Sequence, residues 1–248
     1  MKKIYSIILL LLFLSSNAFC ACDSFTKLLL HADGTDASTT FIDSSTFVHT
    51  VTTGGNAQLD TAQKKFGTAS GLFDGTGDYL TNDGGADFAF STGDFTIDFL
   101  VRFAGLPEAN VTLYESRPSG TNGAYPVLYK NASHQLIYFA NSADQITSTT
   151  TFVVDTWYHI AVTRSGTSTK MFINGTQEGS TYSDSTNYIV GASKPAIGIA
   201  LDLSSNPLNG WIDELRVSKG VARWTANFTP ETSAYCPVDT SSMLEIFE

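Results

Sequence analysis

Side chains able to carry out chemistry are present in this 248-residue chain, but their spacing forms no recognisable catalytic motif. Ser70 stands one position away from the serine of a Gly-x-Ser-x-Gly nucleophile turn. The histidines at positions 31, 49, 134 and 159 lack the His-Glu-x-x-His spacing of zinc hydrolases. The segment from Asp74 to Asp78 lacks the lysine of a phosphate loop and the later glutamate of a calcium loop, so it predicts a tight hairpin.

Aromatic side chains offer another kind of chemistry, because ligand sites combine aromatic faces with a few polar groups. Five aromatic residues are candidates for contact with a sugar: Tyr114, Tyr125, Tyr129, Tyr138 and Trp211. We take Tyr114, Tyr129 and Trp211 as the ligand-binding residues. The alternative for each is a place in the core or at its rim.

The charge of the chain excludes one class of partner. Lys and Arg number 14 against 24 Asp and Glu, which gives a formal charge of −10. Binding to nucleic acid needs clustered basic residues, so we expect no nucleic-acid partner. Charged residues make up only 15% of the chain and apolar residues 42%, which excludes a disordered acidic chain and favours a packed core.

The N-terminus resembles a secretory signal peptide. Lys2 and Lys3 precede an apolar run from Ile7 to Leu14, and small residues follow up to Cys20. We expect residues 1–20 to be removed, which predicts a secreted, cell-surface or periplasmic protein. The alternative is a lipoprotein acylated at Cys22. The rest of the chain has no apolar run long enough for a membrane span.

The cysteines predict one disulfide. Of Cys20, Cys22 and Cys236, the first leaves with the signal peptide, so an even pair remains in an oxidising compartment. Cys22 and Cys236 can meet if the first and last strands of a sandwich are neighbours. Two free thiols, or a retained Cys20 that pairs with Cys22, are the alternatives.

Short alternating segments separated by turn residues predict strands along most of the chain. The clearest one places Phe95, Ile97, Phe99, Val101 and Phe103 on a core-facing side. Asn174-Gly175 predicts a tight hairpin. The predicted strands are Lys27–His31, Gly71–Asp74, Asp78–Thr81, Phe95–Phe103, Val111–Glu115, Pro126–Lys130, Leu136–Ala140, Tyr158–Arg164, Lys170–Ile173, Ala196–Ile199 and Gly210–Val217.

Six phrases stand in an order that resembles a known family. They are LLLHADG from Leu28, FGTASGLFDGTGDYL from Phe66, GDFTID from Gly93, WYHIAVTR from Trp157, MFING from Met171 and NGWIDELRVS from Asn209. The chain is similar to the laminin-G-like jellyroll domains of the concanavalin A-like lectin/glucanase superfamily. The resemblance implies an all-β fold, a two-sheet antiparallel jelly-roll sandwich with one concave face. We place this domain at residues 24–235 and a short C-terminal tail at 236–248.

The resemblance also bears on metal binding and catalysis. Many members hold a structural ion, which suggests Ca²⁺ held by Asp33 and Asp213 with carbonyls near Gly71; the alternative is that Asp33 caps a turn and Asp213 binds backbone amides. Glucanase relatives place acids at every second position of one strand, but here Leu100 and Arg102 follow Asp98. Asp213 and Glu214 are adjacent and are expected on opposite strand faces, while Glu214 can pair with Arg216.

These observations predict a secreted, non-catalytic binding module that holds a glycan or an extracellular protein on its concave face. A structural or adhesive component of a surface or particle is the first alternative. A polysaccharide-cleaving enzyme is the second, because distant segments can still bring two carboxyl groups together.

Overall fold

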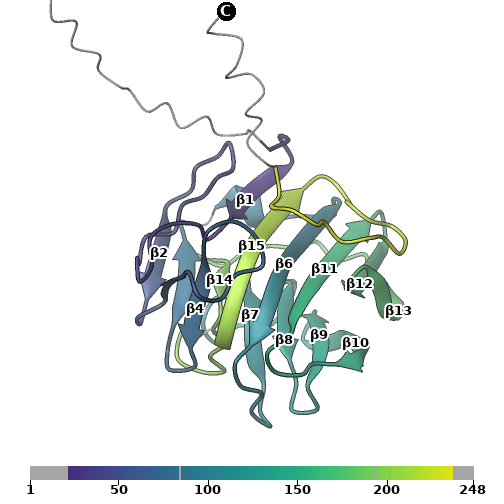
Figure 1. Ribbon diagram of the computed structural model, residues 1–248. Helices are drawn as coiled ribbons and strands as arrows, with labels where there is room; N and C mark the ends of the chain where they lie inside the picture. The colour runs from purple at the N-terminus through teal and green to yellow at the C-terminus, as the bar shows by residue number, and fades with distance from the viewer. Residues whose placement is uncertain (1–21, 84, 193, 201, 237–248) are drawn as a thin grey trace, which may run out of the picture.

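The computed structural model describes residues 22–83, 85–192, 194–200 and 202–236. The predicted signal peptide (residues 1–20) and the tail beyond Cys236 lie outside these residues. Antiparallel strands form two sheets that pack as a sandwich, so the predicted fold class is confirmed (Figure 1). Within the described part of the chain, no helix is long and apolar enough to cross a membrane.

The first sheet has eight strands in the order β13-β12-β11-β6-β15-β4-β3, with β1 also paired to β15. Its strands are β1 (Thr26–Leu30), β3 (Gln58–Asp60), β4 (Ser70–Asp74), β6 (Phe95–Phe103), β11 (Trp157–Ser165), β12 (Ser168–Ile173), β13 (Thr176–Ser183) and β15 (Asn209–Lys219).

The second sheet has seven strands in the order β10-β9-β8-β7-β14-β5-β2. Its strands are β2 (Val51–Gly54), β5 (Tyr79–Asn82), β7 (Val111–Glu115), β8 (Val127–Lys130), β9 (Gln135–Ala140), β10 (Ala143–Thr151) and β14 (Ala196–Ile197). A 3-10 helix, η1 (Ala86–Phe88), precedes β6.

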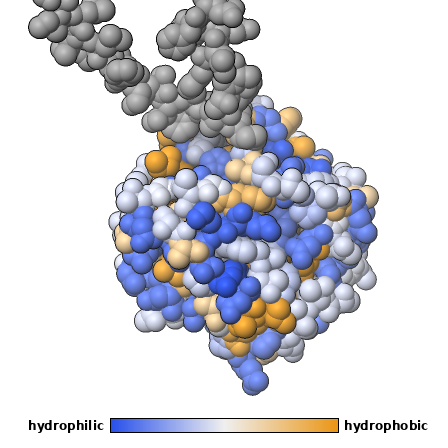
Figure 2. Space-filling model, viewed as in Figure 1, coloured by the Kyte–Doolittle hydropathy of each residue, from blue (hydrophilic) through white to orange (hydrophobic). Residues whose placement is uncertain are grey.

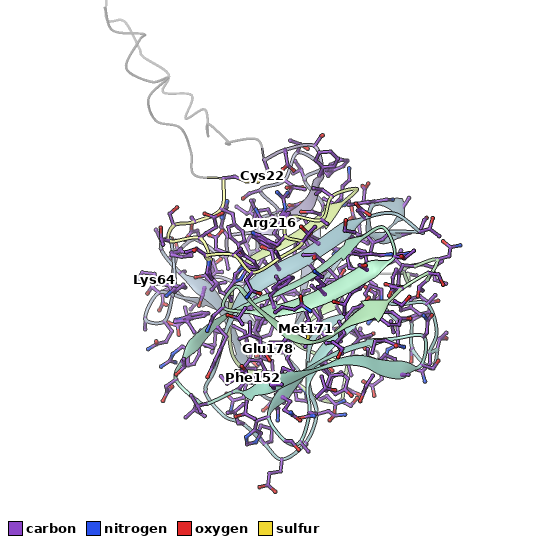
Figure 3. The ribbon with its side chains drawn as sticks, turned by 90° about the vertical axis from the view of Figure 1, so that its right-hand side faces the viewer. Cys22, Lys64, Phe152, Met171, Glu178 and Arg216 are labelled. Carbon is purple, nitrogen blue, oxygen red and sulfur yellow. A yellow bond between two sulfur atoms is a disulfide. The ribbon has the colours of Figure 1, made fainter. Side chains whose placement is uncertain are left out.

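The core lies between the two sheets. The inward side of β6 is fully buried along its whole length, as the alternation predicted: Phe95, Ile97, Phe99, Val101 and Phe103 are each 0% exposed. Met171 and Phe152, labelled in Figure 3, belong to the same core. The Asn174-Gly175 turn joins β12 to β13 with a positive φ at both residues (50° and 77°), which confirms the predicted hairpin.

A C-terminal strap, residues 221–236, crosses the outer face of the first sheet (Figure 1). Trp224 and Phe228 stack on each other with ring centroids 4.1 Å apart, and both meet the His159 ring edge-on. The strap ends at the Cys22–Cys236 disulfide, which confirms the predicted pairing; the two Cα atoms are 5.6 Å apart. The strap therefore covers part of this sheet face and is fixed covalently at its end.

Two expectations about β15 are wrong, for one reason. Asp213 faces Leu100 and Arg216 faces Asp98, so β15 carries one extra residue, and Glu214 there has a φ of 50°. This β-bulge breaks the alternation on which the opposite-face argument depended. Glu214 pairs with His31, while Arg216 pairs with Asp98.

Candidate functional site

A hollow of about 130 Å³ lies on the outer face of the second sheet. Thr112 and Val127 form its buried floor. Tyr129, Phe139 and Arg117 are half-buried, and their side chains line the hollow beside that floor. The side chains of Asn110 and Asn206 complete the lining.

Strand register brings these side chains to one face. Thr112 of β7 lies opposite Tyr129 of β8, and Val127 of β8 lies opposite Phe139 of β9. Because side chains alternate along a strand, Tyr129 and Val127 share the outer face, and the two aromatic residues become diagonal neighbours across β8 and β9. The hollow thus receives two ring faces at fixed positions.

Arg117 is held in place on several sides. Its Nε and Nη2 donate to the two oxygens of Glu115, at 2.9 and 2.7 Å, and Nη1 donates to Asn122 at 2.7 Å. Its guanidinium carbon lies 4.9 Å from the centre of the Phe139 ring. Glu115 is fully buried, so this bidentate pair neutralises the charge of the arginine while leaving its remaining N–H groups for a ligand.

Tyr129 is also fixed. Its hydroxyl donates to Asp144 Oδ1 at 2.7 Å. Burial and the neighbouring Asp144 carboxylate raise the pKa of Tyr129, so the hydroxyl stays protonated across the physiological range. The hollow therefore combines two oriented aromatic rings, amides and a hydroxyl, which are the groups that bind neutral polar ligands.

The three aromatic residues predicted from the sequence occupy three different environments. Tyr129 lines the hollow. Tyr114 is 0% exposed and belongs to the core, so its ring offers no face to a ligand and we remove it from the candidate site. The cause is a bulge in β7, where Thr112 faces Tyr129 and Tyr114 faces Leu128, which turns Tyr114 inward.

Trp211 lies on the other sheet, half-buried on the outer face of β15. Its indole N–H donates to Asp60 at 2.7 Å, and the Arg102 guanidinium lies 4.8 Å from its ring centre. Trp157 of β11 is opposite Arg102 on the other side. The face shown in Figure 2 mixes hydrophilic and hydrophobic groups without one dominant apolar patch. Trp211 cannot share a ligand with Tyr129, because the two residues lie on the outer faces of different sheets.

The two predicted metal ligands, Asp33 and Asp213, hold the same loop. Asp33 Oδ1 accepts hydrogen bonds from the backbone N–H groups of Thr68 and Ala69. Asp213 Oδ2 accepts from the backbone N–H groups of Lys65 and Phe66, at 2.8 and 3.0 Å. Asp213 thus binds backbone amides, as the alternative predicted. Asp33 also accepts from backbone amides, but these belong to the same loop before β4 and not to a turn at Asp33 itself.

One atom of this pair has no protein partner. Asp213 Oδ1 is buried and makes no hydrogen bond to the described residues. Burial raises the pKa of Asp213 to about 7; the charges of Glu214 and Asp33 act in the same direction, while the Phe66 and Lys65 amides oppose it. Gly71 lies in β4 opposite Ile212 of β15, and the predicted contribution of carbonyls near Gly71 to a metal site stays a prediction.

No three His, Cys, Asp or Glu residues in the described ranges are placed to hold a metal ion. A cation at Asp33 and Asp213 would need backbone or water oxygens as its further ligands, which Ca²⁺ accepts. The free Oδ1 of Asp213 therefore fits Ca²⁺, and the two-carboxylate set leaves most of the coordination to other oxygens.

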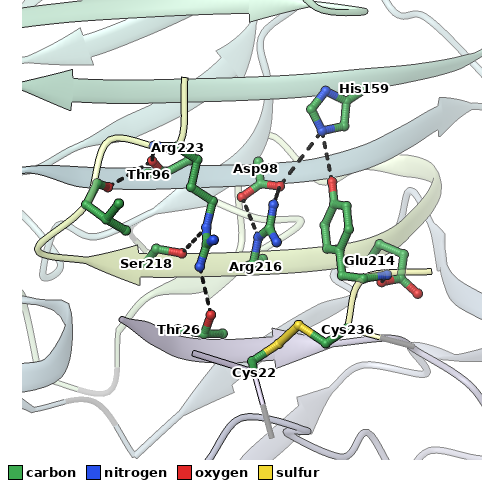
Figure 4. A network of polar contacts seen from close by, with 12 residues as sticks. Cys22, Thr26, Thr96, Asp98, His159, Glu214, Arg216, Ser218, Arg223 and Cys236 are labelled. Carbon is green, nitrogen blue, oxygen red and sulfur yellow. Dashed lines mark hydrogen bonds and ion pairs between the residues drawn. A yellow bond between two sulfur atoms is a disulfide. The ribbon is translucent and has the colours of Figure 1, made fainter. Parts of the chain in front are cut away.

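A buried ion pair lies beneath the C-terminal strap (Figure 4). Asp98 accepts hydrogen bonds from Arg216 Nε and Nη2 at 3.1 and 2.9 Å. The Arg216 guanidinium stacks on the Tyr235 ring at 4.0 Å, and the Tyr235 hydroxyl lies 2.8 Å from His159 Nε2. His159 is thus a packed, hydrogen-bonded histidine, and the group anchors the strap.

Sequence reasoning missed Phe139, Arg117, Asn110 and Asn206 at the hollow. The alternation of Leu136–Ala140 was available to identify Phe139, since it shares a face with Ile137, away from Tyr138. The two asparagines carry no such signal, because their position depends on loops that meet only in the fold.

Comparisons with known proteins agree with this architecture. Residues 74–225 match the family model described as the concanavalin A-like lectin/glucanases superfamily. No curated protein has a sequence that matches the chain.

Solved structures share the fold at low sequence identity. Domain 4 of AbnA, an extracellular arabinanase from Geobacillus stearothermophilus solved with arabinotriose, has a TM-score of 0.58 and 18% identity, covering 79% of this chain and 93% of that one. The receptor-binding domain of botulinum neurotoxin C/D mosaic serotype has a TM-score of 0.57 and 13% identity, covering 80% of this chain. The binding domain of Paraclostridial Mosquitocidal Protein 1 has a TM-score of 0.58 and 16% identity, covering 79% of this chain. This chain spans 49% of each of the last two.

Proposed function

Because the chain belongs to the concanavalin A-like lectin/glucanases superfamily, we propose that it is a non-catalytic module that binds a glycan in the hollow on its second sheet. The observation that carries this proposal is the set of Tyr129, Phe139 and Arg117 around one hollow, each fixed by its neighbours. The arabinanase domain solved with arabinotriose gives neutral oligosaccharides as the first ligands to test.

Binding without cleavage is supported by where the carboxyl groups lie. The two aspartates with strongly displaced pKa values, Asp98 and Asp213, are both 0% exposed, so neither reaches a polysaccharide. At the hollow, Glu115 is paired with Arg117 and Asp144 accepts the Tyr129 hydroxyl. A glycosidase needs two carboxyl groups free to face one bond.

We place the protein outside the cytoplasm. The Cys22–Cys236 disulfide is typical of secreted, cell-surface and periplasmic proteins. The N-terminal segment read as a signal peptide supports the same location.

Removing either aromatic ring of the hollow is expected to weaken glycan binding strongly. A panel of soluble neutral polysaccharides, screened by affinity electrophoresis, selects the ligand. Phe139→Ala and Tyr129→Ala should each weaken it at least about tenfold, which corresponds to about 1.4 kcal/mol, because stacked aromatic anchors dominate such interfaces. Phe47→Ala removes an exposed ring outside the hollow and serves as the matched control. Loss of binding in Trp211→Ala with full binding in Phe139→Ala would move the site to the first sheet and contradict the proposal.

We further propose that Asp33 and Asp213 hold a structural Ca²⁺. Extracellular calcium sites bind with Kd of about 10⁻⁴–10⁻³ M, so 10 mM CaCl₂ is expected to raise Tm by about 3–10 °C over EDTA. Asp213→Asn should lose this shift, because it removes the negative charge of the carboxylate to which the free buried oxygen belongs. An unchanged Tm in calcium, or an equal shift in Asp213→Asn, would rule out the site; 10 mM MgCl₂ controls for ionic strength.

A further inference from the structure

A second, larger depression opens beside the hollow. It has a volume of about 680 Å³ and is lined by three segments: the β4–β5 turn around Thr76, the β6–β7 loop from Gly105 to Asn110, and Asn206 and Pro207 with Asn209 at the start of β15. Asn110 and Asn206 line both depressions. We call this second depression the groove. The shared asparagines make the hollow and the groove one continuous surface.

The two depressions differ in how much of a ligand each can hold. Sites that enclose a small organic ligand usually have volumes of about 300–1,000 Å³. The hollow, at about 130 Å³, falls below that range, whereas the groove, at about 680 Å³, lies within it. The hollow therefore accommodates one unit of a ligand, and further units have space only in the groove.

The β6–β7 loop between the two depressions is firmly held. The Lys130 ammonium is buried and donates to the carbonyls of Pro107 and Ala109. The backbone N–H of Ala104 donates to Asn209 O at 3.0 Å. The Asn209 side chain packs between Gly75 and Gly105, where a Cβ would lie 3.0 and 3.1 Å from its atoms. A wall fixed in this way does not need ordering when a ligand binds, which lowers the entropic cost of binding.

The lining of the groove fits a neutral, hydroxyl-rich chain. Leu106, Pro107 and Pro207 give it apolar surface between its polar groups. Among the described residues, the side-chain amides of Asn110 and Asn206 make no hydrogen bond, so both are available to a ligand. These groups match the alternation of C–H and O–H groups on a sugar chain.

Charge argues against an acidic polymer. Asp74 lines the groove and is exposed, and Asp144 lies beside the hollow at Tyr129. The one arginine in the hollow is already paired with Glu115. The chain as a whole carries a formal charge of −10, so a polyanion would be repelled.

We infer that the protein binds an internal stretch or extended end of a neutral polysaccharide, with one sugar in the hollow and the following sugars in the groove. This inference rests on the proposed glycan-binding function and specifies its ligand. The groove contributes affinity that grows with the number of sugars until the groove is full.

The test is a chain-length series measured by isothermal titration calorimetry. Arabino-, xylo-, cello- and malto-oligosaccharides of one to six units are titrated into the mature protein. A bacterial host is used because Asn110 begins an Asn-Val-Thr sequence that glycosylating hosts modify. For the sugar that binds, the tetrasaccharide should bind at least about tenfold more tightly than the disaccharide.

Two variants distinguish an effect of the groove from a general effect of the substitution on the fold. Thr76→Trp places a bulky ring in the groove from an exposed turn position, and it leaves the Thr76 backbone N–H bond to Asp74 in place. It should keep binding of the shortest ligand and lose the gain with length. Thr167→Trp is the matched control: Thr167 is exposed in the β11–β12 turn, beside the pair Arg164–Phe95, at the end of the first sheet opposite to the groove.

The outcomes distinguish this inference from the function on which it rests. If one series binds with equal affinity at every length, or if Thr76→Trp retains the gain, the inference is wrong and the glycan-binding proposal stands. If no oligosaccharide and no polysaccharide binds, the proposed function itself fails. Tighter binding of sulfated or uronic-acid chains than of neutral ones would overturn the assigned ligand class.

Discussion

Asp98→Ala is expected to destabilise the fold by about 3–5 kcal/mol, which lowers Tm by about 6–20 °C. The variant leaves the Arg216 guanidinium buried beneath the strap without its carboxylate. Removing one partner of a buried ion pair is costly because the remaining charge keeps its desolvation penalty and loses its compensation. Urea denaturation followed by tryptophan fluorescence measures the free energy of unfolding.

The double variant Asp98→Leu/Arg216→Met is the control, because it removes both charges and keeps apolar bulk under the strap. Replacing a buried pair by apolar residues is often nearly neutral, so we expect most of the lost stability to return. A double variant as unstable as Asp98→Ala would show that the pair matters for its shape and not for its charge. A cost below about 1 kcal/mol for Asp98→Ala would contradict the burial of the pair.

The dependence of the free energy of unfolding on pH at acidic pH gives a second test of the same ion pair. Burial alone would raise the pKa of Asp98, but the charge of Arg216 and its hydrogen bonds bring that pKa down to about 2. A carboxyl with a lowered folded-state pKa stabilises the fold above its unfolded value of 3.8 and loses this contribution as pH falls through about 2. The loss of stability between pH 4 and pH 2 should therefore be smaller in the double variant.

Sequence patterns predicted the interior of the two sheets and missed their edges. Every predicted strand corresponds to an observed one, and Phe95–Phe103 and Val111–Glu115 have the predicted bounds. The four strands without a prediction are β2, β3, β10 and β13, which stand at the ends of the two strand orders. Edge strands expose one side to water, as the largely exposed residues of β10 and β13 show, so they lack the apolar alternation by which strands are recognised.

Bulges explain where face assignments failed. In β7 the extra residue turns Tyr114 into the core, and in β15 it gives Glu214 a positive φ and moves Arg216 opposite Asp98. A pattern of alternating residues contains no mark of such an insertion. Tyr129 lies on a segment without a bulge on its β9 side, where side chains alternate regularly and Tyr129 shares the outer face with Val127.

The remaining parts of the site depend on contacts between distant segments. Asn110 and Asn206 are 96 positions apart and meet at the hollow because Thr112 donates its backbone N–H to the carbonyl of Asn206. Asp33 and Asp213 were predicted to lie near each other, and they do hold one loop; the ion that they were predicted to bind remains a proposal. The sequence alone does not show how close Asn110 lies to Asn206, or Asp33 to Asp213.

Loss of the Cys22–Cys236 disulfide is expected to cost about 2–5 kcal/mol of unfolding free energy. The bond joins residues 214 positions apart, and closing so long a loop restricts the unfolded chain strongly, by about 5 kcal/mol on a chain-entropy estimate. It also joins the segment before β1 to the end of the strap, where Cys22, Leu29 and Tyr235 form a small apolar cluster separate from the main core. Urea denaturation of wild type and of Cys22→Ser/Cys236→Ser, with and without dithiothreitol, measures the effect.

The variant and the reductant control for each other, since dithiothreitol should weaken the wild type to the level of the double variant and leave the variant unchanged. Glycan binding should survive in both below their melting temperatures, because the hollow lies on the second sheet whereas the strap covers the first. If reduction removed glycan binding from a protein that is still folded, the strap and the first sheet would have to take part in recognition. Equal stability with and without the bond would instead mean that the contacts of Tyr235 with Arg216, His159 and Glu214 suffice to hold both termini.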